Sequence, residues 1–327
     1  MSDMKAVAML SGGLDSILAV KLMLDQGIDV VAVNFASPFH IFKENEVQKM
    51  AKRFNFPLKT IKLGKDYLRV IRNPKYGYGK HMNPCVDCRI FMLKKAKTYA
   101  KKIGASFIFT GEVLNERPMT QTRHSLDLIE KESGLQGKLL RPLSAKLLPE
   151  IEAEKKGWVD RTKLLDIKGR QRKRQMELAK KFKIKDYPHP GGGCLLTYKE
   201  FSVKVKDLFQ HKRRINLVDI DLLKIGRHFR FGKNKIIVGR NEVENKQLLK
   251  MKNKNDYYFE VPDVGSPITI LQGLKTKVAI EKAAALTARY SDSKKKKVFV
   301  YYGKKKLNKL IVIPPLTRKE IKKLRIS

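Results

Sequence analysis

The stretch Leu10-Ser11-Gly12-Gly13-Leu14-Asp15-Ser16 decides how the first part of the chain folds. It follows an apolar run, 6–10, that reads as a buried strand, and it opens a helix expected over 16–26. Two glycines let the backbone turn tightly, so that its N–H groups, the Ser11 and Ser16 hydroxyls and the helix N-terminus face one anion. Asp15 falls in the first helical turn, where it can cap the helix or hold a Mg²⁺ ion that bridges phosphates. The stretch predicts a phosphate-binding loop, with a plain glycine turn as the alternative.

Strand-like and helix-like segments alternate outward from this loop. We expect further strands at 30–35, 58–63 and 106–110, and helices at 44–54 and 89–103. This alternation is typical of βαβ units, so it predicts an α/β fold with a doubly wound parallel sheet.

The last third of the chain has a different pattern. It contains short β-rich runs and one helix, which predict a smaller, basic α+β domain. The runs lie at 235–238, 257–261, 268–271 and 297–302, and the helix at 278–290. We therefore expect two domains, residues 1–204 and 205–327.

The chain carries 71 Lys plus Arg against 32 Asp plus Glu, a formal net charge of +39. From residue 195 onward there are 33 basic and 12 acidic residues, so the last part is the more basic per residue. Such an excess sets up a positive field that attracts polyanions, above all nucleic acid. The apolar runs stop short of the ~20 residues of a membrane span, no signal peptide is visible, and an odd cysteine count argues against a secreted disulfide scaffold. We expect a cytoplasmic protein that meets nucleic acid and no membrane.

The three cysteines lie in two segments. The first segment is Asn83-Pro84-Cys85-Val86-Asp87-Cys88. The second follows about a hundred residues later and is Gly191-Gly192-Gly193-Cys194. A Cys-x-x-Cys turn aims two thiols at one point, and a Gly-rich loop lets a third approach. Three chemistries fit: a tetrahedral zinc site, a redox or persulfide pair, and an iron–sulfur cluster held by three thiolates.

A dense basic run, Lys168-Gly169-Arg170-Gln171-Arg172-Lys173-Arg174, begins a helix expected to reach residue 182. Charge runs are often solvated faces. This one lies shortly before the Gly-Cys loop, where Arg170, Arg172, Lys173 and Arg174 are well placed to contact RNA phosphates. His81 is expected on a surface loop, and His189 is a candidate for lining the cysteine site.

Ser-Gly-Gly-Leu-Asp-Ser resembles the PP-loop signature of the ATP pyrophosphatases, which share a HUP-type α/β domain. These enzymes cleave ATP between the α- and β-phosphates and adenylate a carbonyl oxygen. The resemblance implies ATP and Mg²⁺ as cofactors and Ser11, Gly12, Gly13, Asp15 and Ser16 as the pyrophosphate grip. It further implies that the strand around Asn34 borders the adenine and that Thr110-Gly111-Glu112 forms a second turn on the nucleotide side.

The segments around the cysteines resemble those of tRNA 2-thiouridylases. A cysteine at position 85, often an Asp in the cluster-free members, completes the three-cysteine set of the [4Fe-4S]-dependent thiolation enzymes. The resemblance implies Cys85, Cys88 and Cys194 as cluster ligands and as catalytic residues, together with Asp15. A persulfide pair of Cys88 and Cys194 is the next alternative.

The C-terminal part resembles the NFACT RNA-binding module, most clearly at 235–245, 256–259 and 264–267. Where that family usually has Trp-Phe-His and Gly-Ser-His, this chain reads Tyr-Phe-Glu and Gly-Ser-Pro.

These resemblances together imply an ATP-dependent tRNA thiolation enzyme. It would make 2-thiouridine at the wobble base or 4-thiouridine near position 8, with sulfur from inorganic sulfide or a persulfide carrier, and a homodimer is a family-level expectation. Two alternatives stay open: a PP-loop ligase or amidotransferase-like enzyme acting on a small molecule with a structural zinc, and a non-enzymatic RNA-binding adaptor.

Overall fold

A computed structural model describes residues 4–40, 44–185, 187 and 193–327 of the chain. Contacts between residues divide it into two compact units, Met1–Thr197 and Tyr198–Ser327. The boundary expected after residue 204 falls inside a helix, α8 (Lys199–His211), which belongs wholly to the second unit. Along its described residues, no helix is long and apolar enough to cross a membrane.

The first unit is built on a parallel five-stranded sheet in the order β3-β2-β1-β4-β5. Its strands are β1 (Lys5–Met9), β2 (Asp29–Ala36), β3 (Leu58–Lys62), β4 (Phe107–Thr110) and β5 (Leu139–Leu140). The central strand β1 is buried almost throughout, as expected for a parallel sheet covered on both faces. The predicted doubly wound α/β class is confirmed.

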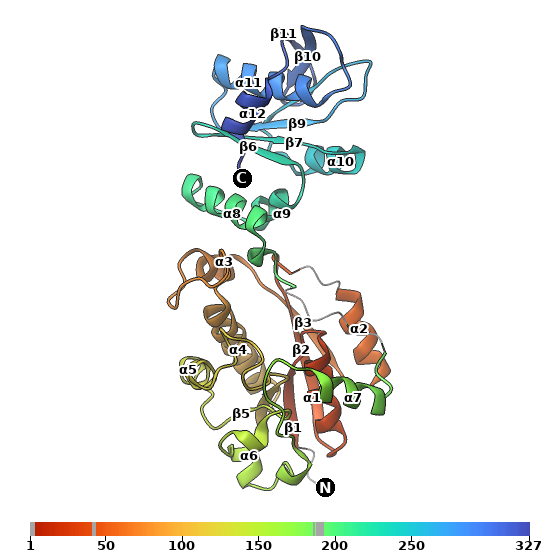
Figure 1. Ribbon diagram of the computed structural model, residues 1–327, viewed down its shortest axis with the longest axis vertical. Coiled ribbons are helices and arrows are strands. Elements are labelled where there is room, and N and C mark those ends of the chain that lie inside the picture. Colours follow the sequence, from red (N-terminus) through yellow and green to blue (C-terminus); the bar gives the residue numbers. More distant parts are fainter. Residues whose placement is uncertain (1–3, 41–43, 186, 188–192) are drawn as a thin grey trace. The chain divides into compact units, whose positions relative to one another are not determined.

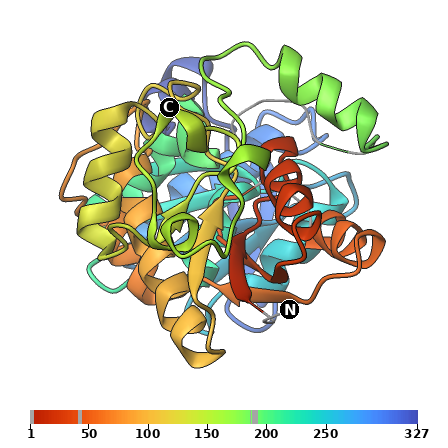
Figure 2. The ribbon, with the colours of Figure 1, turned by 90° about the horizontal axis from the view of Figure 1, so that it is seen from below.

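Helices cover both faces of this sheet (Figure 1). One face carries α1 (Leu14–Leu24), α2 (Glu44–Arg53) and α7 (Lys173–Lys181); the other carries α3 (Lys65–Arg72), α4 (Cys85–Lys102) and α5 (Arg123–Ser133). A short helix, α6 (Glu152–Lys155), and the single turns η1 (Ala145–Leu147), η2 (Arg161–Lys163) and η3 (Leu195–Thr197) complete the unit. Figure 2, in which the molecule is seen from below, shows α1 (red) and α5 (yellow) on opposite sides of the strands. Strand order reverses around β1, so the loops after β1 and β4 meet at the carboxyl edge where such sheets bind ligands.

The second unit holds a six-stranded sheet in the order β11-β10-β8-β9-β7-β6, with antiparallel pairing throughout. Its strands are β6 (Arg227–Phe231), β7 (Asn234–Val238), β8 (Tyr257–Glu260), β9 (Thr269–Gln272), β10 (Val298–Gly303) and β11 (Lys309–Ile313). Its helices are α8, α9 (Leu217–Lys224), α10 (Glu242–Met251), α11 (Lys277–Tyr290) and α12 (Arg318–Leu324).

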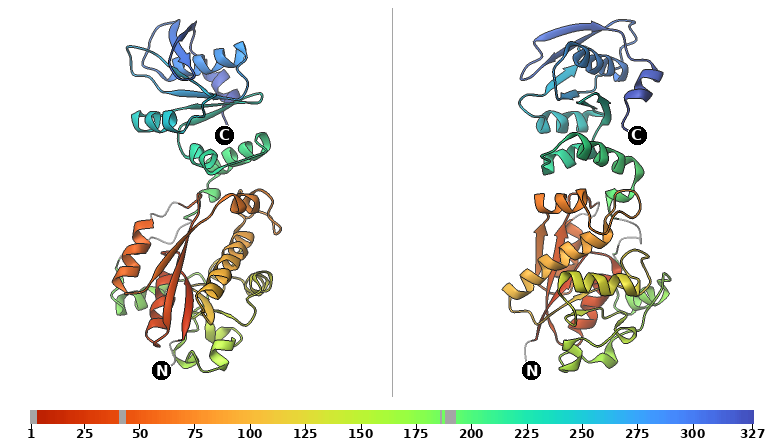
Figure 3. Two further views of the ribbon diagram at one scale, coloured as in Figure 1. Left: turned by 180° about the vertical axis from the view of Figure 1, so that it is seen from behind. Right: turned by 90° about the vertical axis from the view of Figure 1, so that its left-hand side faces the viewer.

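The alanine-rich face of α11 packs on one side of this sheet, and residues of α9 and α10 pack on the other (Figure 3). The predicted α+β class of this unit is confirmed. Four strands and α11 lie where the sequence predicts them. Strand β6, in which Phe alternates with Arg and His, was not predicted, and neither was β11.

Candidate active site

The phosphate loop has the conformation that its sequence predicts. Gly12 has φ +85°, a left-handed conformation that favours glycine, and Gly13 forms the N-cap of α1. The Ser11 hydroxyl donates to Ser16 Oγ at 3.2 Å, and the Ser16 hydroxyl donates to the Gly13 carbonyl at 2.7 Å. Both serines therefore brace the loop at the start of the helix, where an anion is favoured.

Two neighbouring residues hold this loop in place. The Asn34 side-chain amide on β2 donates to the carbonyl of Leu10 at 2.8 Å, which fixes the exit of the chain from β1. Gly111 follows β4 and lies against the backbone of Asp15 and Ser16, so closely that a Cβ atom there would come within 2.4 Å of it. The structure thus gives Asn34 and Gly111 a part in positioning the loop.

Asp15 is surrounded by charged side chains. Its Oδ2 atom lies 3.7 Å from an Arg172 guanidinium nitrogen, and within the described part of the chain its buried Oδ1 has no hydrogen-bond partner. Burial raises the pKa of Asp15, against the opposing charges of Arg172 and Arg117. Burial and the charge of Asp15 also raise the pKa of Glu116 to about 7. A buried carboxylate oxygen without a partner, next to a loop built for phosphate, fits the hard oxygen ligand that Mg²⁺ requires.

The basic run divides into two parts. Arg172 turns inward: its side chain is 14% exposed, and among the described residues its buried Nε atom has no partner. Arg170, Lys173 and Arg174 are exposed, and Arg174 forms an ion pair with Asp166 at 2.7 Å. Arg172 was predicted to contact RNA together with the other three. Its side chain lies beside Asp15, whereas the other three side chains are exposed, and RNA contact by these four residues stays a prediction.

The three cysteines gather near the same edge of the sheet. Cys85 and Cys88 form the first turn of α4, after Pro84 as its N-cap. Cys194 pairs through its backbone with His40, just beyond β2, and the Leu195 N–H donates to the Phe39 carbonyl at 2.8 Å. The Met82 N–H in turn donates to the Leu196 carbonyl, which ties the two cysteine segments together.

The thiols lie in an apolar, partly shielded region. Burial raises the pKa of Cys85, that of Cys88 to about 11 and that of Cys194 to about 12, and the neighbouring thiols add to the rise for Cys88 and Cys194. The Tyr67 hydroxyl lies 2.9 Å from Cys88 Sγ.

Among the described residues, no group of three or more His, Cys, Asp or Glu is arranged to hold a single metal ion. Thiolates are the usual ligands of iron–sulfur clusters, so the donor chemistry of the three cysteines fits that group.

Arg117 connects the two parts of the site. Its positive charge lowers the pKa of Asp15 in the phosphate loop and also that of Cys85, although burial outweighs it at both residues. One side chain therefore lies within electrostatic range of the nucleotide loop and of the thiols.

A buried ion-pair network supports the same edge of the sheet. Glu112, which follows Gly111, accepts a hydrogen bond from Thr110 and pairs with Arg89 at 3.0 Å and with Arg141 at 3.1 Å. Burial raises the pKa of Glu112, but the two guanidinium groups more than offset it, so that the pKa lies below its usual value. Arg89 follows Cys88 directly, so the network positions the first turn of α4.

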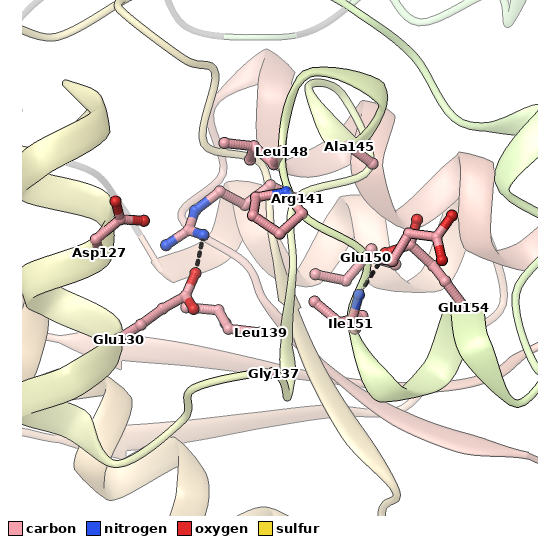
Figure 4. Close-up of a pocket in the computed structure, with 12 residues that line it drawn as sticks. Asp127, Glu130, Gly137, Leu139, Arg141, Ala145, Leu148, Glu150, Ile151 and Glu154 are labelled. Atoms are coloured by element: carbon pink, nitrogen blue, oxygen red, sulfur yellow. Dashed lines mark hydrogen bonds and ion pairs between the residues drawn. The ribbon is translucent and has the colours of Figure 1, made fainter.

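Arg141 also pairs with Glu130, at the wall of a small pocket (Figure 4). None of the residues lining this pocket belongs to the phosphate loop or to the cysteine segments. It is therefore separate from the candidate site.

Several of these residues were not predicted from the sequence. Tyr67, Arg89, Glu116 and Arg117 belong to no motif, and the one available signal was that Glu116 and Arg117 lie in the loop after a parallel strand. His81 lies in the 79–83 turn with φ +60° and is exposed, as expected. His189, Gly191 and Gly192 lie outside the described residues.

Two family models match the chain. Residues 1–155 match the thiamine biosynthesis protein (ThiI) family, and residues 226–325 match the NFACT protein RNA binding domain. These matches confirm the resemblance of the first part of the chain to PP-loop tRNA-thiolation enzymes and that of the last part to the NFACT module.

Curated relatives match part of the chain. A probable tRNA sulfurtransferase of Thermococcus kodakarensis is 32% identical over 148 residues, and the match covers 42% of this chain and 36% of the relative. A tRNA-specific 2-thiouridylase of Leptospira biflexa is 31% identical over 128 residues, 33% of each chain. The chain thus spans about a third of the length of the curated relatives that it matches.

Among solved structures, the U34-tRNA thiolase NcsA from Methanococcus maripaludis, with its [4Fe-4S] cluster, is similar to this chain with a TM-score of 0.37 and 18% identity. The similarity covers 64% of this chain and 66% of that one.

Proposed function

We propose that this chain, in which a segment of the ThiI family (residues 1–155) precedes an NFACT-type RNA-binding segment (residues 226–325), is an ATP-dependent tRNA sulfurtransferase. In the proposed reaction, a uridine carbonyl oxygen of tRNA attacks the α-phosphorus of ATP and pyrophosphate leaves. Sulfide then adds to the activated carbon, and AMP departs with the former carbonyl oxygen. The product is 2-thiouridine at the wobble base or 4-thiouridine near position 8.

The observation that carries this proposal is that β2 joins the two parts of the site: Asn34 on β2 holds the phosphate loop, and His40 just beyond β2 pairs through its backbone with Cys194. A carbonyl oxygen is a poor leaving group until AMP is attached to it. Adenylation and sulfur transfer must therefore take place at one carbon, with phosphate-binding and sulfur-holding groups next to each other. Phosphate loops are common in enzymes of many classes, but one adjoining three thiols supports thiolation in particular.

For the first half of the reaction, we propose that Ser11, Gly12, Gly13, Asp15 and Ser16 hold the pyrophosphate part of ATP, with Asp15 as the Mg²⁺ ligand. The unpartnered Oδ1 of Asp15 and the unpartnered Nε of Arg172 support this assignment, because a metal-bound phosphate would satisfy both buried groups. Asn34 keeps the loop in register and borders the adenine.

For the second half, we propose that Cys85, Cys88 and Cys194 hold a [4Fe-4S] cluster. A cluster with three protein thiolates leaves one iron free to bind a hydrosulfide. The thiols are partly buried beside the buried Tyr67, and restricted access of water would favour attack by sulfide over hydroxide. The alternative is a persulfide that Cys88 or Cys194 receives from a persulfide carrier; after its outer sulfur has attacked the activated carbon, the other thiol releases the thiolated base by forming a disulfide, which an added thiol reduces. Inorganic sulfide or a persulfide carrier supplies the sulfur.

We further propose tRNA as the macromolecular partner. The second unit carries 33 Lys plus Arg against 12 Asp plus Glu, and the exposed Arg170, Lys173 and Arg174 in the first unit add positive charge.

The test begins with anaerobic purification and measurement of iron, acid-labile sulfide and zinc. About four irons and four sulfides per chain, lost in Cys85→Ala, support the cluster assignment. The protein is then incubated with tRNA, ATP and sulfide, and thiolated nucleosides are identified by mass spectrometry.

Three outcomes would contradict parts of the proposal. Thiolation by iron-free protein when a persulfide donor replaces sulfide, with none from sulfide itself, would replace the cluster with the persulfide route. Stoichiometric zinc, with ATP cleavage that does not depend on tRNA, would favour the small-molecule ligase. tRNA binding without ATP cleavage would favour the RNA-binding adaptor.

A further inference from the structure

The outer side of the β10–β11 hairpin carries four exposed apolar side chains. Phe299 and Tyr301 on β10 are 48% and 36% exposed, and Leu310 and Val312 on β11 are 48% and 46% exposed. The strand register places Phe299 opposite Val312 and Tyr301 opposite Leu310. Because directly paired residues share a face of a sheet, the four side chains form one continuous patch, which we call the hairpin face.

The core of the domain does not account for this patch. The alternate residues Val298 and Val300 point to the other side and are buried in the cluster that includes the alanines of α11. In an antiparallel sheet with one buried side, the solvent side is normally polar. Two aromatic rings at the solvent positions of β10, next to the last strand of the sheet, therefore indicate a binding surface.

The charge around the hairpin face is almost wholly positive. Eight exposed lysines lie next to or within the hairpin: Lys294–Lys297 before β10, Lys304–Lys306 in the turn, and Lys309 on β11. The sequence contains no Asp or Glu from residue 293 to residue 319. One carboxylate lies next to the patch: Glu260 on β8, which is the strand partner of Tyr301 on β10.

This combination favours a polyanion that also presents flat apolar surfaces. A second copy of the chain would bring the same lysines against these, so like charges would meet. A purely apolar partner would leave the lysines without a counterpart. Unpaired nucleotides supply both features, because their bases stack on aromatic rings and their phosphates pair with lysine.

We infer that the hairpin face binds single-stranded RNA, with bases stacked on Phe299 and Tyr301 and phosphates along the lysines. The inference deepens the proposed function, since it takes RNA as the substrate class and assigns the surface that grips an unpaired segment of it.

The test uses the full chain and a fluorescein-labelled single-stranded oligoribonucleotide, with a duplex of the same length for comparison. Binding is followed by fluorescence anisotropy at several salt concentrations. Phe299→Leu and Tyr301→Leu keep an apolar side chain but remove the ring. We expect each to weaken single-strand binding about fivefold or more, since stacking on one ring accounts for at least that factor. Binding of the duplex should change less.

The controls separate stacking from folding and from general surface effects. Tyr301→Phe keeps the ring and should bind like the wild type. Val243→Ala and Leu274→Ala alter apolar residues that are 65% and 63% exposed elsewhere in the same unit, and should also leave binding unchanged. Replacing Lys304, Lys305 and Lys306 with Gln should reduce the slope of log affinity against log salt.

Wild-type affinity in both leucine variants would overturn the inference, as would a concentration-dependent dimer, seen by sedimentation, that these variants abolish. Neither outcome would affect a thiolation activity measured independently. Conversely, the protein could bind RNA through these rings and yet thiolate no tRNA. That result would support the RNA-binding role of the hairpin face and overturn the proposed reaction.

Discussion

Gly111 and Asp15 lie so close together that a single added carbon would not fit between them. A Cβ atom on Gly111 would approach the carbonyl carbon and oxygen of Asp15 to 2.4 Å, and the amide nitrogen of Ser16 to the same distance. The turn after β4 therefore packs directly against the phosphate loop after β1 and fixes the distance between these two turns.

Gly111→Ala tests this packing. The methyl group meets backbone on all three sides, so the loop must shift, and we expect loss of ATP binding with a decrease of about 1–3 kcal/mol in the free energy of unfolding. Isothermal titration calorimetry and urea denaturation measure the two effects. In the matched control Gly64→Ala, the nearest atom to the new Cβ is a flexible Asp66 oxygen at 3.5 Å, so both quantities should stay at wild-type values. Normal ATP affinity in Gly111→Ala would show that the loop adapts.

Arg172 and Lys173 are adjacent in sequence but face different ligands in our assignment. Arg172→Gln removes the guanidinium beside Asp15 and should raise the KM for ATP roughly tenfold, the scale of one charged hydrogen bond, with little effect on tRNA affinity. Lys173→Gln should do the reverse, because its side chain is exposed. Initial rates at varied ATP and a tRNA filter-binding assay distinguish the two. Equal effects of both changes on tRNA affinity would restore Arg172 to the RNA-contacting group.

The Glu112 network should contribute strongly to stability. Glu112→Gln removes the one negative charge that Arg89 and the 3% exposed Arg141 share, and leaves Arg141 with Glu130 as its remaining acidic partner. We expect a loss of about 3–5 kcal/mol in the free energy of unfolding, the range for breaking one partner of a buried pair. Glu132→Gln breaks an exposed pair with Lys75 and serves as the control, with no measurable loss expected. Chemical denaturation measures the free energy of unfolding of both variants. Similar values for the two variants would contradict a strong contribution of the Glu112 network to stability.

Lys235 gives the second unit a defined pH dependence. Burial lowers its pKa to about 8, from a usual value of 10.5. Between these two values the unfolded chain binds the proton and the folded chain does not, so stability rises with pH across this window. Below pH 8 the buried charge costs roughly 3 kcal/mol.

Lys235→Met should therefore stabilise the protein at pH 7 by up to about 3 kcal/mol and flatten the rise between pH 8 and 10. Urea denaturation at several pH values measures both. Lys233→Met, at an exposed neighbouring position, should leave the profile unchanged. A variant with the wild-type pH profile would mean that another group causes the dependence.

Local patterns were sufficient to predict much of the fold. The four strands predicted in the first unit form: β1, β2 and β4 are largely apolar runs, and β3 mixes apolar and polar residues at the edge of the sheet. Helix α5 was not predicted within the long segment after residue 113, although Thr122 caps it and Gly134 ends it in a left-handed conformation. Strand β6, Arg-His-Phe-Arg-Phe, resembles a charged loop in sequence and becomes a strand because Phe229 is buried in the core and Arg230 pairs with Asp207.

The sequence alone determined the phosphate loop, the two cysteine segments and the basic character of the second unit, since each depends on neighbouring residues or on composition. Only the tertiary structure decided that the charge of Arg117 acts on both Asp15 and Cys85, that Arg172 turns toward the phosphate loop and that Glu112 is buried between two arginines. It also decided that Phe299 and Tyr301 face solvent. The reason is that charges and rings act through space, and their distances are set by how strands far apart in the sequence pair and how loops fold back over them.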